Sequence, residues 1–285
     1  MTHSENVDSA HVDQRHLPRP QIKIPKALVP RLITAAVLIP AVGAIIWWVD
    51  QPIIYGLLCI VCFGLLFEWA AVAHIQSNIV KLFYAGIGTS MAIVIPLLGD
   101  GAILATAILA VCASVPAFIS VLLFSKVQRL LTNSVVVAVL GWVICVGAMV
   151  CCGFLRGGGF ALLSLFVVVW LVDTGAYFAG TYFGSHKLNR TLSPNKTWEG
   201  VIGGVTLGLI ACLVLDIFIG WFPIPNYWAW LIVAFLAVVG DLFESALKRV
   251  ADMKDSGDLL PGHGGLLDRL DSALLAAPCV YLLLA

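Results

Sequence analysis

Long apolar stretches follow one another along almost the whole chain, and they limit the folds that are open to it. A helix that crosses a bilayer core about 30 Å thick needs roughly 17 to 25 apolar residues. Hydrophobic residues make up 61% of the chain and the mean hydropathy is +1.01, far above the range of soluble domains. The sequence therefore predicts an all-α polytopic membrane protein. We expect about nine transmembrane helices, near residues 32–49, 53–73, 82–98, 102–124, 134–155, 160–183, 200–221, 227–243 and 270–285.

Positive charge predicts the orientation of these helices, because Lys and Arg collect in cytoplasmic loops. With nine spans and a cytoplasmic N-terminus, 15 of the 16 Lys and Arg residues fall on the cytoplasmic side, and Arg156 falls outside. The last two spans are short and carry charge at one end, so a count of eight also remains open. In this orientation the two longest interior loops, near 184–199 and 250–266, both face the cytoplasm.

Composition divides the chain into three regions. Residues 1–31 are polar and contain several prolines, so we expect a disordered tail. Residues 32–155 carry few ionisable groups within their spans and are interpreted as a transmembrane scaffold. Residues 156–285 carry most of the remaining polar residues and are interpreted as the catalytic region. The eight cysteines fall within or beside apolar spans, which favours buried, inert thiols.

Charged side chains crowd into Ser245–Asp271, although only 11% of the chain is charged. Just before this stretch, Asp241 and Glu244 lie three residues apart and share one helix face. Asp268 and Asp271 repeat the spacing after the loop. Carboxylates presented by two neighbouring helix ends form a hard oxygen site, which suits Mg²⁺. The predicted metal ligands are Asp241 and Asp268, followed by Asp271 and Glu244, and a second cation is compatible with them.

The same residues allow a second interpretation, a salt-bridged helix at the water interface. In that case Lys248, Arg249 and Arg269 only neutralise the acids. In the metal-site interpretation, these residues and Lys254 offset the negative charge of phosphate groups. The glycine-rich turn between the two carboxylate groups favours the metal site, because a solvated helix face does not require it.

That turn, PGHGG, precedes a helix. Gly262, Gly264 and Gly265 surround His263, so bare backbone N–H groups there are expected to cradle phosphate oxygens at the helix N-terminus. Three roles remain open for His263. It is a phosphate contact, a proton carrier or a hydrogen-bond donor that fixes the loop.

The segment as a whole resembles the signature of the phosphatidate cytidylyltransferase family, integral membrane enzymes that make CDP-diacylglycerol from CTP and phosphatidic acid. The matching positions are Ser245, Lys248-Arg249, Lys254-Asp255, Pro261, His263-Gly264-Gly265, Asp268-Arg269 and Asp271. Upstream, WLVDTGAYFAGTYFG resembles the family's WxxDxGAYxxGxxFG segment, and SPNKTWEG resembles its SPxKTWxG element. No departure from the core signature is visible.

Asp173 lies inside the sixth predicted span, within WLVDTGAYFAGTYFG. An unpaired acid at the membrane centre costs roughly 2.5 to 3.5 kcal/mol on insertion scales, so its side chain must face protein or water. We interpret Asp173, together with Tyr177, Gly180 and Gly184, as lining a substrate cavity. The alternative is a buried acid that pairs with a basic residue for packing.

The SPNKTWEG loop follows, and the resemblance implies that it binds phosphate or cytidine. Lys196 is the first choice for a phosphate contact, although a basic cytoplasmic turn is expected in any membrane protein. Trp198 is either an interfacial anchor or a platform for the base. The predicted catalytic residues are Asp241, Asp268, Lys248, Arg249, His263 and Asp271. The predicted substrate-binding residues are Lys196, Ser193, Asn195, Asp173, Ser245, Lys254, Asp255, Gly264, Gly265 and Arg269.

The resemblance implies that a phosphatidate oxygen attacks the α-phosphorus of Mg²⁺-bound CTP, giving CDP-diacylglycerol and pyrophosphate for phospholipid biosynthesis. We expect the site to face the cytoplasm from the inner membrane. A CTP-dependent lipid kinase is the alternative among enzymes, and a membrane transporter would also place acids within its spans. The expected partners are CTP, phosphatidic acid and the bilayer, without nucleic acid, and the chain is compatible with a homodimer.

Overall fold

The predicted all-α polytopic membrane fold is confirmed by a computed structural model of the protein. The structure describes residues 43, 48–155, 158–189, 192–219, 227–257, 259 and 264–285. Within these residues, seven helices are long and apolar enough to cross a membrane. The predicted tail, 1–31, and most of the first predicted span, near 32–49, lie outside the described residues.

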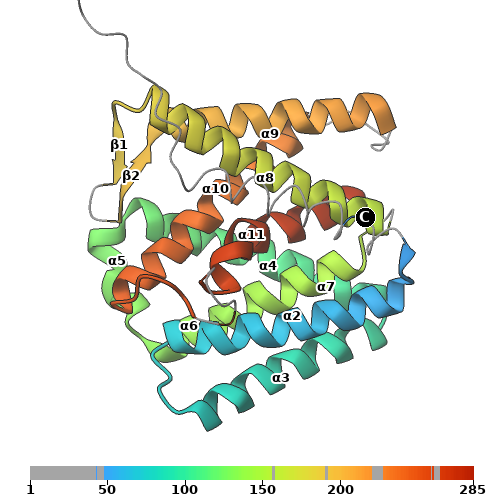
Figure 1. Ribbon diagram of the computed structural model, residues 1–285. Helices are drawn as coiled ribbons and strands as arrows, with labels where there is room; N and C mark the ends of the chain where they lie inside the picture. The colour runs from blue at the N-terminus through green and yellow to red at the C-terminus, as the bar shows by residue number, and fades with distance from the viewer. Residues whose placement is uncertain are drawn as a thin grey trace, which may run out of the picture. The chain divides into compact units, whose positions relative to one another are not determined.

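Each of the other eight predicted spans overlaps a helical segment. The continuous helices are α2 (Gln51–Val72), α3 (Asn78–Leu97), α4 (Asp100–Leu122), α8 (Gly159–Tyr182), α9 (Trp198–Ile219), α10 (Tyr227–Val250) and α11 (Leu267–Leu284). The span near 134–155 is composite, with α6 (Ser134–Gly141), a π-helical segment (Trp142–Val146) and α7 (Gly147–Gly153). Within Ile45–Ala285, α10 and α11 lie between the α8–α9 pair and the α2–α3 pair (Figure 1).

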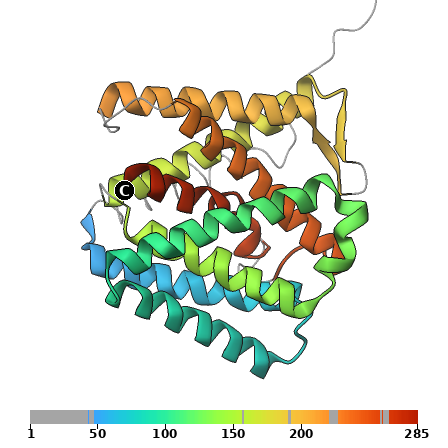
Figure 2. The same cartoon turned by 180° about the vertical axis from the view of Figure 1, so that it is seen from behind.

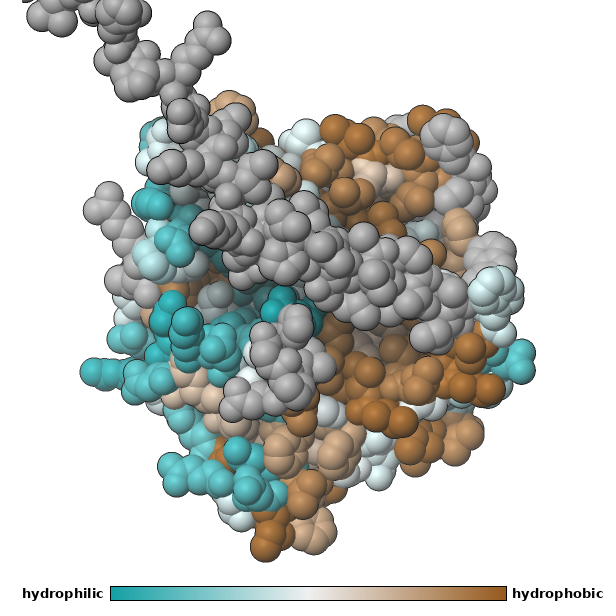
Figure 3. Space-filling model, in the orientation of Figure 1, coloured by the Kyte–Doolittle hydropathy of each residue, from teal (hydrophilic) through white to brown (hydrophobic). Residues whose placement is uncertain are grey.

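Two elements were not expected from the sequence. The short helix α5 (Phe124–Leu131) follows α4 and is amphipathic, with Phe124 and Leu131 buried and Lys126 and Arg129 exposed. The predicted loop near 184–199 contains an antiparallel hairpin of β1 (Lys187–Asn189) and β2 (Ser193–Thr197). Hydrophilic side chains gather on the side of the molecule that carries this hairpin and α5 (Figure 3).

Aromatic side chains connect α2 and α3 to the composite span. The Trp69 Nε1–H donates to the Val137 carbonyl at 2.8 Å, and the Tyr84 hydroxyl donates to the Ala138 carbonyl at 2.7 Å. The ring of Tyr84 also stacks on Trp142, with centroids 5.0 Å apart. Because hydrocarbon offers no hydrogen-bond partners, these internal bonds satisfy polar groups that water would otherwise serve.

Glycines let α8 and α9 pack closely, and the two helices lie side by side in both ribbon views (Figure 2). A Cβ atom added at Gly175 would lie 2.7 Å from the Gly203 carbonyl oxygen, and one at Gly204 would lie 2.7 Å from the Val172 carbonyl oxygen. The sequence left open whether Gly203 and Gly204 pack helices within one chain or between chains. In the structure they pack within the chain.

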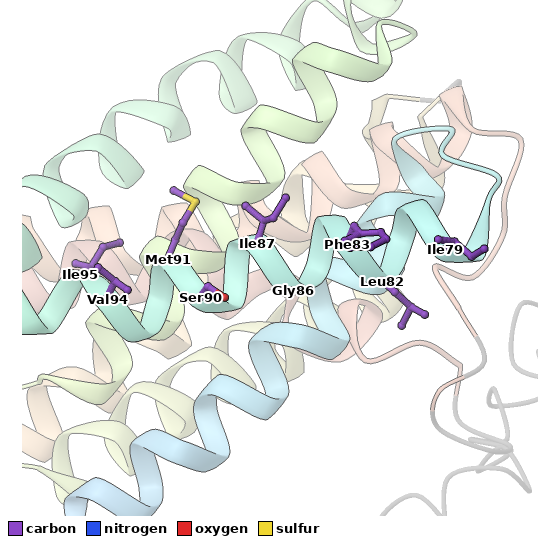
Figure 4. Close-up of a pocket in the computed structure, with 9 residues that line it drawn as sticks. All are labelled: Ile79, Leu82, Phe83, Gly86, Ile87, Ser90, Met91, Val94 and Ile95. Atoms are coloured by element: carbon purple, nitrogen blue, oxygen red, sulfur yellow. The ribbon is translucent and has the colours of Figure 1, made fainter.

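The surface of α3 carries a broad apolar groove of about 770 Å³ (Figure 4). Phe83, Ile87 and Met91 line it, and all three side chains are exposed. Exposed apolar side chains on a helix long enough to cross a membrane are suited to contact with lipid chains. None of the predicted site residues lines this groove, so the chemistry has to be sought elsewhere.

Candidate active site

A polar cavity of about 550 Å³ lies between α8, β2, α9 and α10. It unites three segments that are far apart in the sequence. Asp173 and Tyr177 come from α8, Asn195 and Lys196 from β2, and Asp241 from α10. Lys196 and Asp241 form an ion pair across the cavity, so β2 is tied to α10. The cavity therefore holds both signs of charge at a site that is otherwise surrounded by apolar helices.

The predicted role of Asp173 in a cavity agrees with this arrangement. Its carboxylate lines the cavity and accepts a hydrogen bond from the Ser272 hydroxyl at 3.3 Å. Within the described residues it forms no ion pair, so the alternative of an acid paired with a base for packing is not what these residues show. Tyr177, Gly180 and Ser193 line the same cavity, as does Thr181, which the sequence did not single out.

Gly240 allows α10 and α11 to pack closely beside their carboxylates. A Cβ atom at Gly240 would meet the Asp271 carbonyl oxygen and would lie 3.2 Å from the Ser272 Cα. Only a residue without a side chain allows this approach. As a result Asp241 on α10 and Asp271 on α11 are held near one another, and Asp271 borders the small hollow that Glu244 also lines.

A second polar cluster is centred on Lys248 and includes Glu244. The Lys248 ammonium lies 2.6 Å from Glu244 Oε2 and 2.6 Å from Asp268 Oδ1. The side chains of these residues are largely buried, with exposed fractions of 16% for Lys248, 5% for Glu244 and 14% for Asp268. One cation thus bridges two acids and links the end of α10 to the start of α11.

Asp268 also organises the loop that precedes α11. Its carboxylate accepts hydrogen bonds from the Ser256 N–H at 3.1 Å and from the Gly265 N–H at 2.9 Å. Burial alone would raise the pKa of Asp268, but the side chains of Glu244 and Lys248 and the Gly265 N–H outweigh burial and hold that pKa well below its usual range. Asp268 is therefore ionised, and its carboxylate accepts hydrogen bonds from the Lys248 ammonium and from two backbone N–H groups.

These contacts bear on one part of the predicted phosphate cradle, the Gly265 N–H. The Gly265 N–H already donates to Asp268, so it is not available to a phosphate oxygen. Gly264 has a φ of +83°, a backbone conformation that glycine adopts without strain. His263, Gly262 and Pro261 lie outside the described residues.

The four predicted metal ligands do not assemble into one ligand group. Asp241 pairs with Lys196 in the cavity, whereas Glu244 and Asp268 share Lys248. Among the described residues, no three His, Cys, Asp or Glu side chains converge as a metal-binding group. The physical reason is that most of these carboxylates already have a cationic partner. Oxygen donors that suit Mg²⁺ are nevertheless present in the cavity, where Asp173 and Asp241 both line the wall.

The remaining predicted residues fall into two groups. Arg249 donates from Nε to the Leu192 carbonyl at 3.2 Å, so it ties α10 to the hairpin. Lys254, Asp255 and Arg269 are exposed near the loop, and Ser245 is partly buried on α10. None of these five lines the cavity.

The SPNKTWEG segment is β2 followed by the first turn of α9. The Thr197 hydroxyl accepts a hydrogen bond from the Gly200 N–H at 3.1 Å and so caps α9. The Glu199 carboxylate accepts the His186 N–H at 3.1 Å and lies 2.7 Å from the His186 Nδ1, which fixes the start of the hairpin. Trp198 is half-exposed and does not line the cavity, whereas Lys196 and Asn195 do.

Sequence reasoning missed Glu68, which lies on α2 in the region interpreted as scaffold. Its side chain is buried, with 3% of the residue exposed, and it reaches the loop before α11. A signal was present, because an acid within the apolar stretch near 53–73 calls for the same attention as Asp173.

Comparisons with known proteins identify the family of this chain. The model of the cytidylyltransferase family matches residues 29–285. A phosphatidate cytidylyltransferase of Bacillus subtilis (strain 168) is 50% identical over 122 residues, which cover 42% of this chain and 45% of that protein. One from Staphylococcus saprophyticus is 46% identical over 129 residues, 43% of this chain and 48% of that protein. The matches span about half the length of these curated relatives. Because the family model covers almost the whole chain, the chain belongs to the cytidylyltransferase family.

Proposed function

We propose that this protein is a phosphatidate cytidylyltransferase, which transfers CMP from CTP to phosphatidic acid and releases pyrophosphate. The observation that carries the proposal is the cavity between α8, β2 and α10. It brings Asp173, Lys196 and Asp241 to one place within a membrane protein, so a soluble nucleotide and a lipid phosphate can both reach it. The curated relatives bear the same name.

In the proposed reaction, an oxygen of the phosphatidate phosphate attacks the α-phosphorus of CTP. A new P–O bond forms, the bond between the α-phosphorus and the bridging oxygen breaks, and that oxygen leaves with pyrophosphate. A phosphate monoester is an adequate nucleophile near neutral pH, so the site has to supply positioning and charge neutralisation rather than a strong base. The described cavity offers one cation, Lys196, and two carboxylates, Asp173 and Asp241.

Lys196 is the group that we expect to meet the nucleotide phosphates. Its ammonium faces Asp241 in the cavity and can exchange that partner for a phosphate oxygen. Preorganised cations of this kind stabilise charge that develops in the transition state. Asn195 and Ser193 line the same wall and supply further hydrogen-bonding groups.

Mg²⁺ fits the donor set of the cavity and is part of the proposal. Asp241 would hold it, with Asp173 as the second carboxylate. Mg²⁺ usually takes one or two carboxylates and keeps several waters, alongside substrate phosphates. When bound, it would neutralise phosphate charge and polarise the α-phosphate.

The proposed location is the inner membrane, with the site and the N-terminus on the cytoplasmic side. The excess of Lys and Arg on one predicted side supports this orientation. CTP, phosphatidic acid and the bilayer are the proposed partners, and a homodimer is the proposed assembly if the chain does not act as a monomer.

The test uses purified protein in detergent with phosphatidic acid, Mg²⁺ and CTP labelled at the α-phosphorus. We expect label to enter the lipid phase with wild-type protein, and only when Mg²⁺ and phosphatidic acid are both present. Asp241→Asn should abolish the transfer. The matched control is Asp100→Asn, which neutralises an exposed carboxylate at the start of α4 and should leave the transfer intact.

Other outcomes distinguish the alternatives. If α-label stays in the aqueous phase while γ-labelled CTP marks the lipid, the protein is a lipid kinase. If neither label moves with wild-type protein that is folded and monodisperse, the proposed transfer is wrong and a transporter has to be considered.

A further inference from the structure

Glu68 is an acid buried in the apolar helix α2, and its carboxylate accepts hydrogen bonds from the loop that precedes α11 and from the first residue of α11. Oε1 accepts the Leu266 N–H at 3.0 Å, and Oε2 accepts the Leu267 N–H at 2.7 Å. The Ser256 hydroxyl donates to Oε2 at 3.2 Å. A buried carboxylate is costly without such donors, so these three bonds explain how the acid is tolerated there.

These bonds cap α11 from another helix. The first N–H groups of a helix have no partner within it, and a side chain at the N-cap usually serves them. At α11 the N-cap residue is Leu266, which cannot accept a hydrogen bond through its side chain. Glu68 takes over this task, and its negative charge also lies at the favourable end of the helix dipole.

Two carboxylates hold the same turn from opposite sides. Glu68 accepts the Ser256 hydroxyl, while Asp268 accepts the Ser256 N–H and the Gly265 N–H. Ser256 is 1% exposed and is the link between them. Asp268 is also the partner of Lys248. The turn that Glu68 contacts therefore also donates hydrogen bonds to one carboxylate of the Lys248 cluster.

The glycines of the loop make room for Glu68. A Cβ atom at Gly257 would lie 2.6 Å from Glu68 Oε1, and one at Gly265 would lie 2.7 Å from Glu68 Oε2. These distances are too short for any side chain other than hydrogen. Gly265 of the signature is therefore small because a carboxylate packs against it.

We propose that Glu68 is a positioning residue that acts from the scaffold half of the chain. It caps α11 and fixes the turn at Ser256 and Gly265, and so it holds Asp268 and Lys248, the two catalytic residues that the sequence predicts there, in their observed contact. The inference rests on the proposed function, since it assigns a role in the same transfer. It links α2, in the region that the sequence indicated only as a scaffold, to the turn that holds Asp268.

The test compares Glu68→Gln with Glu68→Asp in the full-length protein. Glutamine keeps the shape, but its NH₂ group faces a donor, so the turn shifts. We expect kcat for CMP transfer to fall about 10²-fold, as a displacement of about 1 Å at a reacting group can cause. KM for CTP should change little, because the cavity residues are untouched. Glu68→Asp keeps the carboxylate and should recover part of kcat.

Two controls separate positioning from general stability. Gln51→Ala removes another α2 side chain, which bonds the Gly153 carbonyl at 3.0 Å, and should leave kcat unchanged. Tyr84→Phe removes a hydrogen bond in the core and should lower Tm but not kcat. The proposal is overturned if Glu68→Gln keeps wild-type kcat, or if Tyr84→Phe with an equal loss of Tm loses kcat equally.

Amide hydrogen exchange provides a readout that does not depend on activity. The Leu266 and Leu267 amides should exchange faster in Glu68→Gln than in wild type, and should be unchanged in Gln51→Ala. If wild-type protein transfers no label, the proposed function fails, and the exchange rates alone then decide whether Glu68 holds the turn. Unchanged exchange in Glu68→Gln would overturn the capping role in either case.

Discussion

The Lys248 ammonium lies 2.6 Å from the Asp268 carboxylate, and this contact joins the two ends of the charged segment across 20 residues of sequence. Lys248 belongs to the last turns of α10, and Asp268 to the first turn of α11. Glu244, one turn before Lys248, shares the same ammonium at 2.6 Å. Removing the Lys248 ammonium would therefore take away the cation that both carboxylates contact in the described residues.

Lys248→Met is expected to damage both stability and activity. The substitution leaves Glu244 and Asp268 as two largely buried acids without a cation, and breaking such a pair typically costs about 3 kcal/mol or more. Thermal unfolding in detergent and the labelled transfer would measure the two effects. Lys248→Arg keeps the charge and should be milder in both. Equal Tm values for wild type and Lys248→Met would contradict the cluster described above.

Lys196→Ala is expected to reduce kcat/KM for CTP by roughly 10²-fold, the usual loss when one preorganised donor is removed from a developing charge. The fold should survive, because Lys196 lies on the hairpin and its contact with Asp241 borders the cavity. The control is Lys187→Ala, which removes an exposed lysine of the same hairpin. If both variants lose activity to the same extent, general basic charge rather than the position of Lys196 is responsible.

Gly204→Ala is expected to destabilise the protein by about 1 to 3 kcal/mol, as overpacking of a close contact does. The added methyl would lie 2.7 Å from the Val172 carbonyl oxygen and 3.0 Å from the Ala176 Cβ, so α8 and α9 must separate. Gly56→Ala is the matched control, since a Cβ atom there has no neighbour within 4 Å. A lower Tm for Gly204→Ala alone is the expected result of thermal unfolding. An equal Tm would mean that α8 and α9 are not in this contact.

The pH dependence of stability should report on Asp268. Its pKa is lowered in the folded protein, so its contribution is present above the unfolded value of about 3.9 and is lost as pH falls through the folded value. The stability that wild type has over Asp268→Asn should therefore shrink as pH falls below about pH 4. Unfolding of both proteins measured from pH 5 downward checks it, and a difference that stays constant through this acid range would contradict the assignment.

Predictions of the membrane helices succeeded because length and hydrophobicity are local properties. The stretch near 53–73, for example, became α2, and the one near 227–243 became α10, which continues past its predicted end to Val250. A run of apolar residues that spans a bilayer has few alternatives to a helix. The hairpin at Lys187–Thr197 was missed because a short polar segment has no comparable constraint.

For the predicted site, the structure shows which of the residues lie together and which partners they contact. Asp173, Lys196 and Asp241 were expected in the substrate site and line one cavity. The metal quartet of Asp241, Asp268, Asp271 and Glu244 was expected from spacing, yet spacing gives no information on which ammonium or N–H group occupies each carboxylate. The Asp268 carboxylate contacts the Lys248 ammonium and accepts hydrogen bonds from the loop amides, and nothing local in the sequence indicates these contacts.

The sequence by itself determined the membrane class, the approximate helix limits and the residues that carry charge, because the bilayer imposes these on each segment separately. Only the tertiary structure decided which charges meet. The contact between Glu68 and Leu267 spans 199 residues, and the approach of α10 to α11 depends on Gly240. Such contacts arise from the packing of several helices at once, so no single stretch of sequence contains them.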